Sequence, residues 1–319
     1  MSVPINEAIF QSGTIEQRFF SKDCETGDSE LFNVPFPASF PDQTQKDIRV
    51  IVTANDLNVP RAAHHAAVVG IAQNVTIGGF ALKVRNSDCA AGFAGMNWMA
   101  ILETPGRQQK PVNLRMGVLQ PQFFSSDCNS GDTRDFGTAF SSSLDSPPVV
   151  LVTANNLNVQ GHNAAAVGIV LDSAISDLAM RGITLKARNS DCAAGSCGFY
   201  YVALTHGAAG GGNLIADTGE VHEQLFFNDC HSGDTRNWDI YFNHPFLTPP
   251  VVLVTAYHAK LDDVHPAAAV GMARNVTPYG FTLVGRNSDC FGPTGLGGPV
   301  IASSAGFYWV AIGCAAGCG

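Results

Sequence analysis

The apolar residues of this chain fall into short runs that are bounded by glycine, proline, asparagine and aspartate. Apolar and polar side chains alternate in several of them, as in FTLVGR at 281–286 and FYWVAI at 307–312. A period of two is typical of a strand with one buried face, and the Val, Ile, Phe, Tyr and Thr that fill these runs favour strands. Helical periodicity is absent, so the sequence predicts an all-β protein.

The runs recur in one order three times. Each copy contains an apolar run ending in Thr-Ala, a histidine followed by small residues, a glycine-led run and an aromatic run. The octapeptide RNSDCAAG at 85–92 returns at 188–195, and RNSDC returns at 286–290. A period of about 100 residues indicates domain duplication, because the repeats of a solenoid are several-fold shorter.

We therefore expect three tandem antiparallel β-sandwich domains, each with about five to seven short strands. Proline and glycine mark the linkers between them. The expected domains are 1–106, 107–209 and 210–313, and a cysteine-rich tail follows at 314–319.

Composition and charge narrow the classes of protein. With 45 % hydrophobic and 14 % charged residues, the chain is globular, and its net charge of −9 argues against a nucleic-acid partner, which requires a basic face. No apolar stretch reaches the ~18 residues of a membrane span. The nine cysteines favour an extracellular or cell-surface location. Because the N-terminus lacks the pattern of a signal peptide, cytoplasmic storage and non-classical export are the alternatives.

Two cysteines recur in every repeat, one in the first loop and one in the RNSDC motif. Their recurrence predicts a disulfide within each domain. Zinc ligation is the alternative, although paired CxxC spacing is absent. Cys197, Cys314 and Cys318 lie outside this pattern, and an odd total leaves at least one thiol free or bonded to another chain. The recurrent cysteines are Cys24, Cys89, Cys128, Cys192, Cys230 and Cys290.

The sequence contains no nucleophile elbow, HExxH motif, dinucleotide fingerprint or kinase signature. We therefore expect no enzymatic activity and no cofactor. A calcium loop built from the DC-x-x-GD and NSD segments is an alternative, but no dense acidic ligand loop is present, so we expect no metal site.

Aspartate, histidine, arginine and asparagine recur at matching positions although the copies otherwise differ. Planar amide, carboxylate and guanidinium groups form paired hydrogen bonds with hydroxyl groups, so this set predicts a sugar site in each copy. The alternatives are local turn chemistry, a histidine bonded to a loop carbonyl, and Arg–Asp ion pairs. We expect Trp98, Tyr201 and Trp309, in alternating runs, to be core residues. The candidate site residues are Asp28, His64, Arg85, Asn86, Asp88, Asp132, His162, Arg188, Asn189, Asp191, Asp234, His265, Arg286, Asn287 and Asp289.

The repeats resemble the H-type lectin domain, the snail-agglutinin fold. The resemblance covers nearly all of each repeat and is strongest in the third, through PPVVLVTAYH, AAAVGMARNVTPYGF and FYWVAIG. It implies six-stranded antiparallel sandwiches, which in that family associate as trimers and bind N-acetylgalactosamine-type sugars between neighbouring protomers. Three linked copies would then pack as a single-chain pseudo-threefold trimer.

The resemblance also implies which loops contact the sugar. The family's Gly/Asp loop falls on Gly27/Asp28, Gly131/Asp132 and Gly233/Asp234. The family's Trp-His step falls on Ser-Asp in each RNSDC motif, so the stacking aromatic is absent and the cleft is more polar. The family's arginine position falls in the alanine run.

These observations predict a multivalent lectin that binds glycans or glycoconjugates of the galactose or N-acetylgalactosamine type, as a monomeric pseudo-trimer or a higher assembly. The alternative is a structural or adhesive extracellular protein that assembles through its sandwiches and spare cysteines.

Overall fold

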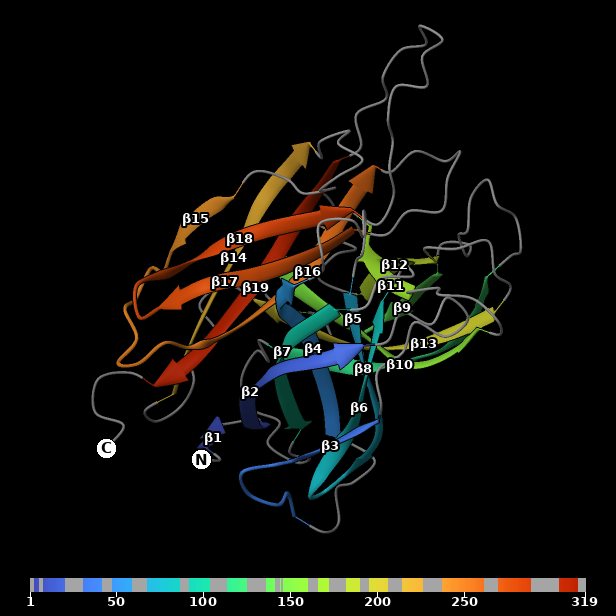
Figure 1. The fold of residues 1–319 in the computed structure, drawn as a ribbon, viewed down its shortest axis with the longest axis horizontal. Coiled ribbons are helices and arrows are strands. Elements are labelled where there is room, and N and C mark those ends of the chain that lie inside the picture. The colour runs from blue at the N-terminus through green and yellow to red at the C-terminus, as the bar shows by residue number, and fades with distance from the viewer. Residues whose placement is uncertain are drawn as a thin grey trace, which may run out of the picture.

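The computed structural model is built of strands alone in the part of the chain that it describes (Figure 1). None of the described segments is a helix, so the described residues include no helix that is long and apolar enough to cross a membrane. The described residues are 3–5, 8–20, 31–41, 48–58, 68–86, 92–103, 114–124, 136–140, 144, 146–159, 166–171, 182–189, 195–205, 214–225, 237–260, 269–287 and 304–314.

Repeat 1 is a sandwich of two antiparallel sheets. The first sheet has the order β1-β2-β7-β4, and the second has the order β3-β6-β5. Its strands are β1 (Val3–Ile5), β2 (Ala8–Phe20), β3 (Phe32–Pro35), β4 (Ile48–Asn58), β5 (Val68–Thr76), β6 (Gly79–Asn86) and β7 (Gly92–Glu103).

Repeats 2 and 3 have the same topology. Within the repeats, the strand order β8-β13-β10 corresponds to β14-β19-β16, and β9-β12-β11 corresponds to β15-β18-β17. Repeats 2 and 3 also share a sheet, because β11 pairs in parallel with β16 at Val170 and Tyr257, which gives the six-stranded order β14-β19-β16-β11-β12-β9. Repeat 2 consists of β8 (Leu114–Phe124), β9 (Phe136–Ala139), β10 (Pro148–Val159), β11 (Ala166–Val170), β12 (Gly182–Asn189) and β13 (Gly195–Thr205). Repeat 3 consists of β14 (Leu214–Leu225), β15 (Trp238–Tyr241), β16 (Val251–Lys260), β17 (Ala269–Thr277), β18 (Gly280–Asn287) and β19 (Ser304–Cys314).

The predicted fold class is therefore confirmed. Three antiparallel sandwiches, each with six equivalent strands, lie around a common centre, repeat 1 in blue, repeat 2 in green and repeat 3 in orange to red (Figure 1). The domain boundaries after 106 and 209 lie outside the described residues and stay predictions. At the third boundary, β19 continues to Cys314, which pairs with Leu214.

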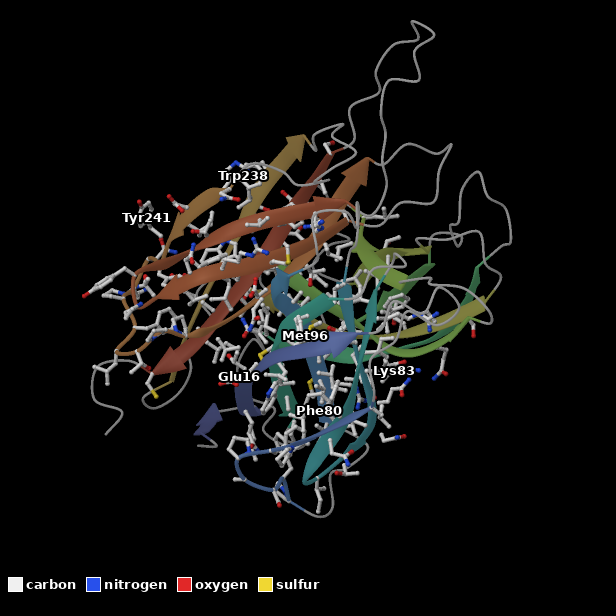
Figure 2. The ribbon with its side chains drawn as sticks, viewed as in Figure 1. Glu16, Phe80, Lys83, Met96, Trp238 and Tyr241 are labelled. Carbon is white, nitrogen blue, oxygen red and sulfur yellow. The ribbon has the colours of Figure 1, made fainter. Side chains whose placement is uncertain are left out.

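Repeats 1 and 3 each have a core cluster of their own, and the core of repeat 2 is continuous with a second core that joins the three repeats. Trp98 and Trp309 are only 3 % and 4 % exposed and pack against Phe80 and Phe281 at ring distances of 5.7 and 5.6 Å, which confirms their prediction as core residues. Figure 2 places Phe80 and Met96 inside repeat 1. Tyr201 is buried as well, at 6 % exposure.

The second core explains why the Thr-Ala strands are continuous apolar runs. In β4, Val50 and Val52 pack into the sandwich of repeat 1, whereas Ile51 packs into a cluster that also contains residues of repeats 2 and 3. Leu151 and Leu253, its equivalents, belong to the same shared cluster. A strand that is buried on both faces loses the polar half of its alternation.

A ring of threonine hydroxyls links the three repeats at the centre. Each threonine accepts a hydrogen bond from the backbone N–H of a valine in another repeat, and the three bonds close a ring. The bonds run from Val52 N to Thr153 Oγ1 at 2.8 Å, from Val152 N to Thr255 Oγ1 at 3.2 Å and from Val254 N to Thr53 Oγ1 at 3.4 Å. The repeats thus form a pseudo-threefold trimer within one chain.

A small cavity of about 60 Å³ lies on this pseudo-threefold axis, lined by the threonines and by the valines and glycines around them. Gly70 is one lining residue, and a Cβ atom there would lie 2.5 Å from Val52 Cγ1. Gly168 and Gly271 meet Val152 and Val254 in the same way, at 2.6 and 2.4 Å. The small-residue run of each repeat therefore allows close packing at the axis.

Candidate functional site: the clefts between repeats

Each repeat packs against another through the same pair of elements, so the molecule has three equivalent interfaces between repeats. In the first interface, β4 of repeat 1 faces β17 of repeat 3, and in the second interface β10 faces β5. In the third interface, β16 and β11 pair as parallel strands. The first interface contains a cleft, which is called the first cleft below. Because the elements are equivalent, the side chains at matching positions can be compared directly.

The first cleft has a volume of about 460 Å³. Repeat 1 contributes hydroxyl, amide and carboxylate groups to its lining, and repeat 3 contributes an arginine, an asparagine and the edge of Pro249–Val251. The lining is therefore about equally polar and apolar and comes from two repeats.

Asn97 is the centre of a hydrogen-bond network in this cleft. Its Oδ1 accepts bonds from Thr14 Oγ1 at 3.0 Å and from Asn55 Nδ2 at 2.8 Å. Its Nδ2 donates to the backbone carbonyl of Val252 in repeat 3 at 2.8 Å. Since Asn97 is only 3 % exposed and has bonds at both ends of its amide, it ties the floor of the cleft to the neighbouring repeat.

An ion pair crosses the mouth of the first cleft. Arg274 Nη2 of β17 lies 3.4 Å from Asp56 Oδ1 of β4, and their side chains are 33 % and 42 % exposed. A partly solvated pair of this kind contributes little to stability. Its guanidinium and carboxylate groups are nevertheless placed side by side, where both reach solvent and a ligand.

The second interface has different side chains at the equivalent positions. Tyr200 replaces Asn97, and the guanidinium carbon of Arg49 lies 6.0 Å from the centre of its ring, within the range of a cation–π contact. Burial raises the pKa of the Tyr200 hydroxyl above its usual value, and the positive charge of Arg49 partly offsets this shift.

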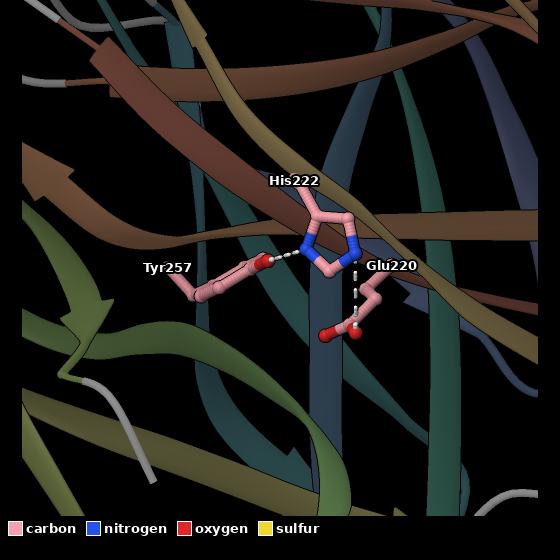
Figure 3. A network of polar contacts seen from close by, with 3 residues as sticks. All are labelled: Glu220, His222 and Tyr257. Atoms are coloured by element: carbon pink, nitrogen blue, oxygen red, sulfur yellow. Dashed lines mark hydrogen bonds and ion pairs between the residues drawn. The ribbon is translucent and has the colours of Figure 1, made fainter. Parts of the chain in front are cut away.

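The third interface contains two stacked aromatic rings. Tyr308 replaces Asn97, Tyr257 replaces Asn55, and their rings stack at a centroid distance of 4.1 Å with 15° between planes. The Tyr257 hydroxyl shares a hydrogen bond of 3.4 Å with His222 Nδ1, and His222 Nε2 lies 3.9 Å from Glu220 Oε1 (Figure 3). The three interfaces are therefore formed by equivalent strands but carry different side chains.

Most of the predicted site residues lie outside the described part of the chain. For four others only the strand backbone is described, namely Asn86, Arg188, Asn189 and Asn287. The predicted aspartates and histidines outside the described residues are Asp28, His64, Asp88, Asp132, His162, Asp191, Asp234, His265 and Asp289.

Two of the predicted arginines are visible in full. Arg85 and Arg286 are 5 % and 9 % exposed and pair across the sheet with Val69 and Val270, which line the axial cavity. The sequence predicts both arginines as candidate sugar-binding residues. They are buried at the ends of β6 and β18, close to the axis, because the RNSDC motif begins inside a strand.

Recurrence of polar positions does not identify the residues of the first cleft. Thr14, Asn55, Asp56, Asn97 and Arg274 are not repeated as a set in the other copies. The sequence marks Asn97 only by a difference between the copies, since the aromatic run reads MNW in repeat 1 but FYY and FYW in the others.

The described cysteines are not bonded to each other. Cys197 is fully buried in the shared core, where burial raises the pKa of its thiol and its Sγ contacts the Gly198 carbonyl at 3.3 Å. Cys314 is half-buried at the end of β19. The six cysteines of the predicted disulfides and Cys318 lie outside the described residues. Nor do three His, Cys, Asp or Glu side chains gather as a metal site within the described strands.

Comparison with known proteins leaves the family open. No protein-family model matches the sequence, and no curated protein matches it significantly. Among solved structures, the chain is similar to wild-type discoidin II from Dictyostelium discoideum, with 16 % identity and a TM-score of 0.24 over 63 % of this chain and 94 % of that chain. The H-type lectin family thus stays a prediction, and at that TM-score the likeness carries no argument about a ligand.

Proposed function

We propose that the protein is a non-catalytic carbohydrate-binding protein whose ligands occupy the clefts between its repeats. The observation that carries the proposal is the first cleft, in which two repeats bring hydroxyl, amide, carboxylate and guanidinium groups to one hollow. Its volume of about 460 Å³ falls in the range of about 300–1,000 Å³ that is typical of small-molecule sites.

The chemistry of this cleft suits a polyhydroxylated ligand. Asp56 and Arg274 offer a planar acceptor and a planar donor side by side, and each can form two parallel hydrogen bonds with neighbouring hydroxyl groups. Asn97 holds the floor in place from below, so a ligand does not have to order it. The described lining contains no aromatic ring, which favours recognition by hydrogen bonds.

The loop residues that the sequence singled out remain part of the proposal. Asp28 and Asp88, with their equivalents, are expected to extend the clefts at the GD and RNSD loops. Several sites in one chain would raise the avidity for a surface that carries many copies of the glycan.

A glycan array tests the proposal. The variant Arg274→Ala removes the guanidinium from the first cleft, and Asn33→Ala is its control, because Asn33 is an exposed polar residue of β3 that does not line the cleft. We expect the wild type and Asn33→Ala to bind the same glycans and Arg274→Ala to bind at least one of them about tenfold more weakly, as for a lost charged hydrogen bond. An array without any bound glycan would sink the proposal.

The predicted loop aspartates need a separate variant. Replacing Asp88, Asp191 and Asp289 with alanine together should weaken binding if the RNSD loops contact the glycan. Unchanged binding by this triple variant would leave the first cleft as the site and remove the loops from it.

A structural or adhesive role is the second candidate, and the half-buried thiol of Cys314 at the end of β19 favours it. Non-reducing electrophoresis with light scattering separates the two functions. Disulfide-linked species that disappear in Cys314→Ser would support assembly, whereas a monomer under oxidising conditions would support a soluble lectin.

A further inference from the structure

Two tyrosine side chains of repeat 3 stand out of the surface at the tip of the sandwich. Tyr241 is 78 % exposed and Tyr279 is 69 % exposed. Tyr241 ends β15 and pairs with Gly280, and Tyr279 precedes Gly280 in the turn between β17 and β18, so the two residues are neighbours. Figure 2 shows Tyr241, together with Trp238, on the outer edge of the molecule, away from repeats 1 and 2.

The backbone below these rings is held firmly. Thr277 Oγ1 donates to the Gly280 carbonyl at 3.1 Å and accepts from Tyr279 N at 3.2 Å, which closes the turn. The following loop is bonded to the same turn, since Phe242 N donates to the Tyr279 carbonyl at 2.9 Å. The ring of Phe242 is anchored in the core against Phe246, at 5.0 Å. The two tyrosines are therefore presented by a preorganised support.

This pair is specific to repeat 3. Pro35 of β3 and Ala139 of β9 have the position of Tyr241, because they pair with the equivalent glycines. Gly78 has the position of Tyr279 in repeat 1. A single exposed aromatic residue needs no explanation, but two adjacent ones on a braced turn resemble a contact surface.

The pair lies at the end of the strand that lines the first cleft. Arg274, Asn275 and Val276 line the cleft, and the chain from Asn275 to Tyr279 spans at most about 14 Å. Asn275, Thr277 and Tyr279 are the exposed residues of this segment, whereas those between them are partly buried. One face of β17 thus runs from the first cleft to the tyrosines.

We propose that Tyr241 and Tyr279 form a stacking platform for the outer sugar units of an oligosaccharide whose first unit occupies the first cleft. This inference rests on the proposed function and adds an extended subsite to it. An aromatic ring offers an apolar face to the C–H groups of a pyranose, and its hydroxyl stays in water, which explains why tyrosine rather than leucine stands here. Asp239 beside the platform, bonded to Thr282 Oγ1 at 3.0 Å, supplies an acceptor for a sugar hydroxyl.

The test compares ligands of different length. The probes are galactose and N-acetylgalactosamine as single sugars and as the terminal units of tri- and tetrasaccharides, titrated by calorimetry. We expect the wild type to bind the longer glycans more tightly than the single sugar. The double variant Tyr241→Ala/Tyr279→Ala should bind the longer glycans roughly five- to tenfold more weakly, with unchanged affinity for the single sugar. Leu31→Ala, at another exposed apolar position, is the control.

The outcomes separate this inference from the proposed function. Equal binding of the longer glycans by the wild type and the double variant would overturn the platform and leave the cleft intact. If Arg274→Ala loses binding while the double variant binds the longer glycans as the wild type does, the cleft is supported and the platform is overturned. A wild type that binds none of these sugars would overturn both. If the double variant instead loses self-association in light scattering while its glycan affinity is unchanged, the tyrosines form a protein contact and the platform is wrong.

Discussion

The threonine ring at the pseudo-threefold axis predicts a graded loss of stability. Thr153 has the strongest role, because its hydroxyl accepts from Val52 N at 2.8 Å and donates to the Val52 carbonyl at 3.0 Å. Thr153→Val keeps the shape and volume but leaves a buried N–H and a buried C=O without partners. At about 1–3 kcal/mol for each of the two unsatisfied groups, the free energy of unfolding should fall by roughly 2–6 kcal/mol.

The other two threonines are the internal controls. Thr255 accepts one bond of 3.2 Å, and Thr53 accepts one bond of 3.4 Å, which is near the limit of a hydrogen bond. Urea unfolding followed by tryptophan fluorescence should rank the valine variants in the order Thr153, Thr255, Thr53, with losses of about 1 kcal/mol or less for the last. Equal losses, or the largest loss at Thr53, would show that the hydroxyl bonds do not hold the repeats together.

Three further predictions concern single side chains. Asn97→Leu should lower the unfolding free energy by about 2–4 kcal/mol in urea titrations, because the Val252 carbonyl loses its donor, and little change would refute the network. A thiol reagent should modify Cys314 in the native protein and Cys197 only on unfolding; comparable rates, measured by mass spectrometry, would contradict the burial of Cys197. The raised pKa of Tyr200 means that the folded state favours the neutral hydroxyl. The resulting contribution to the free energy of unfolding is complete below pH 10 and is lost as the pH rises further, so Tyr200→Phe should unfold less readily at high pH than the wild type.

The strands and the sandwich cores could be predicted from the sequence because they depend on local patterns. The apolar FYWVAI run forms part of β19, and its tryptophan is a core residue as predicted, although burial does not alternate there because the whole run is buried. The threonine of each VTA segment shows the limit of this reasoning. The threonine recurs in the sequence, but its hydrogen bond reaches a valine of another repeat that is about 100 residues away for two of the copies and 201 residues away for the other. Only the arrangement of the repeats reveals that partner.

The first cleft could not be predicted for a related reason. Asp56 and Arg274 are far apart in the sequence, and neither recurs in the other copies. Recurrence identifies residues that occupy equivalent positions in every copy. Arg85 and Arg286 are examples, and both are buried near the axis. A site formed by two copies can differ at each interface, so its residues are found where the copies diverge.

The covalent linkage of the three repeats has a consequence for how this protein can change. In an assembly of three identical subunits, one substitution appears at all three interfaces, and its cost or benefit is tripled. Here Asn97, Tyr200 and Tyr308 occupy one position of the fold with three different side chains. Because the three repeats belong to one chain, each interface can change independently of the others, so one can be a tightly packed aromatic interface while another contains a cleft.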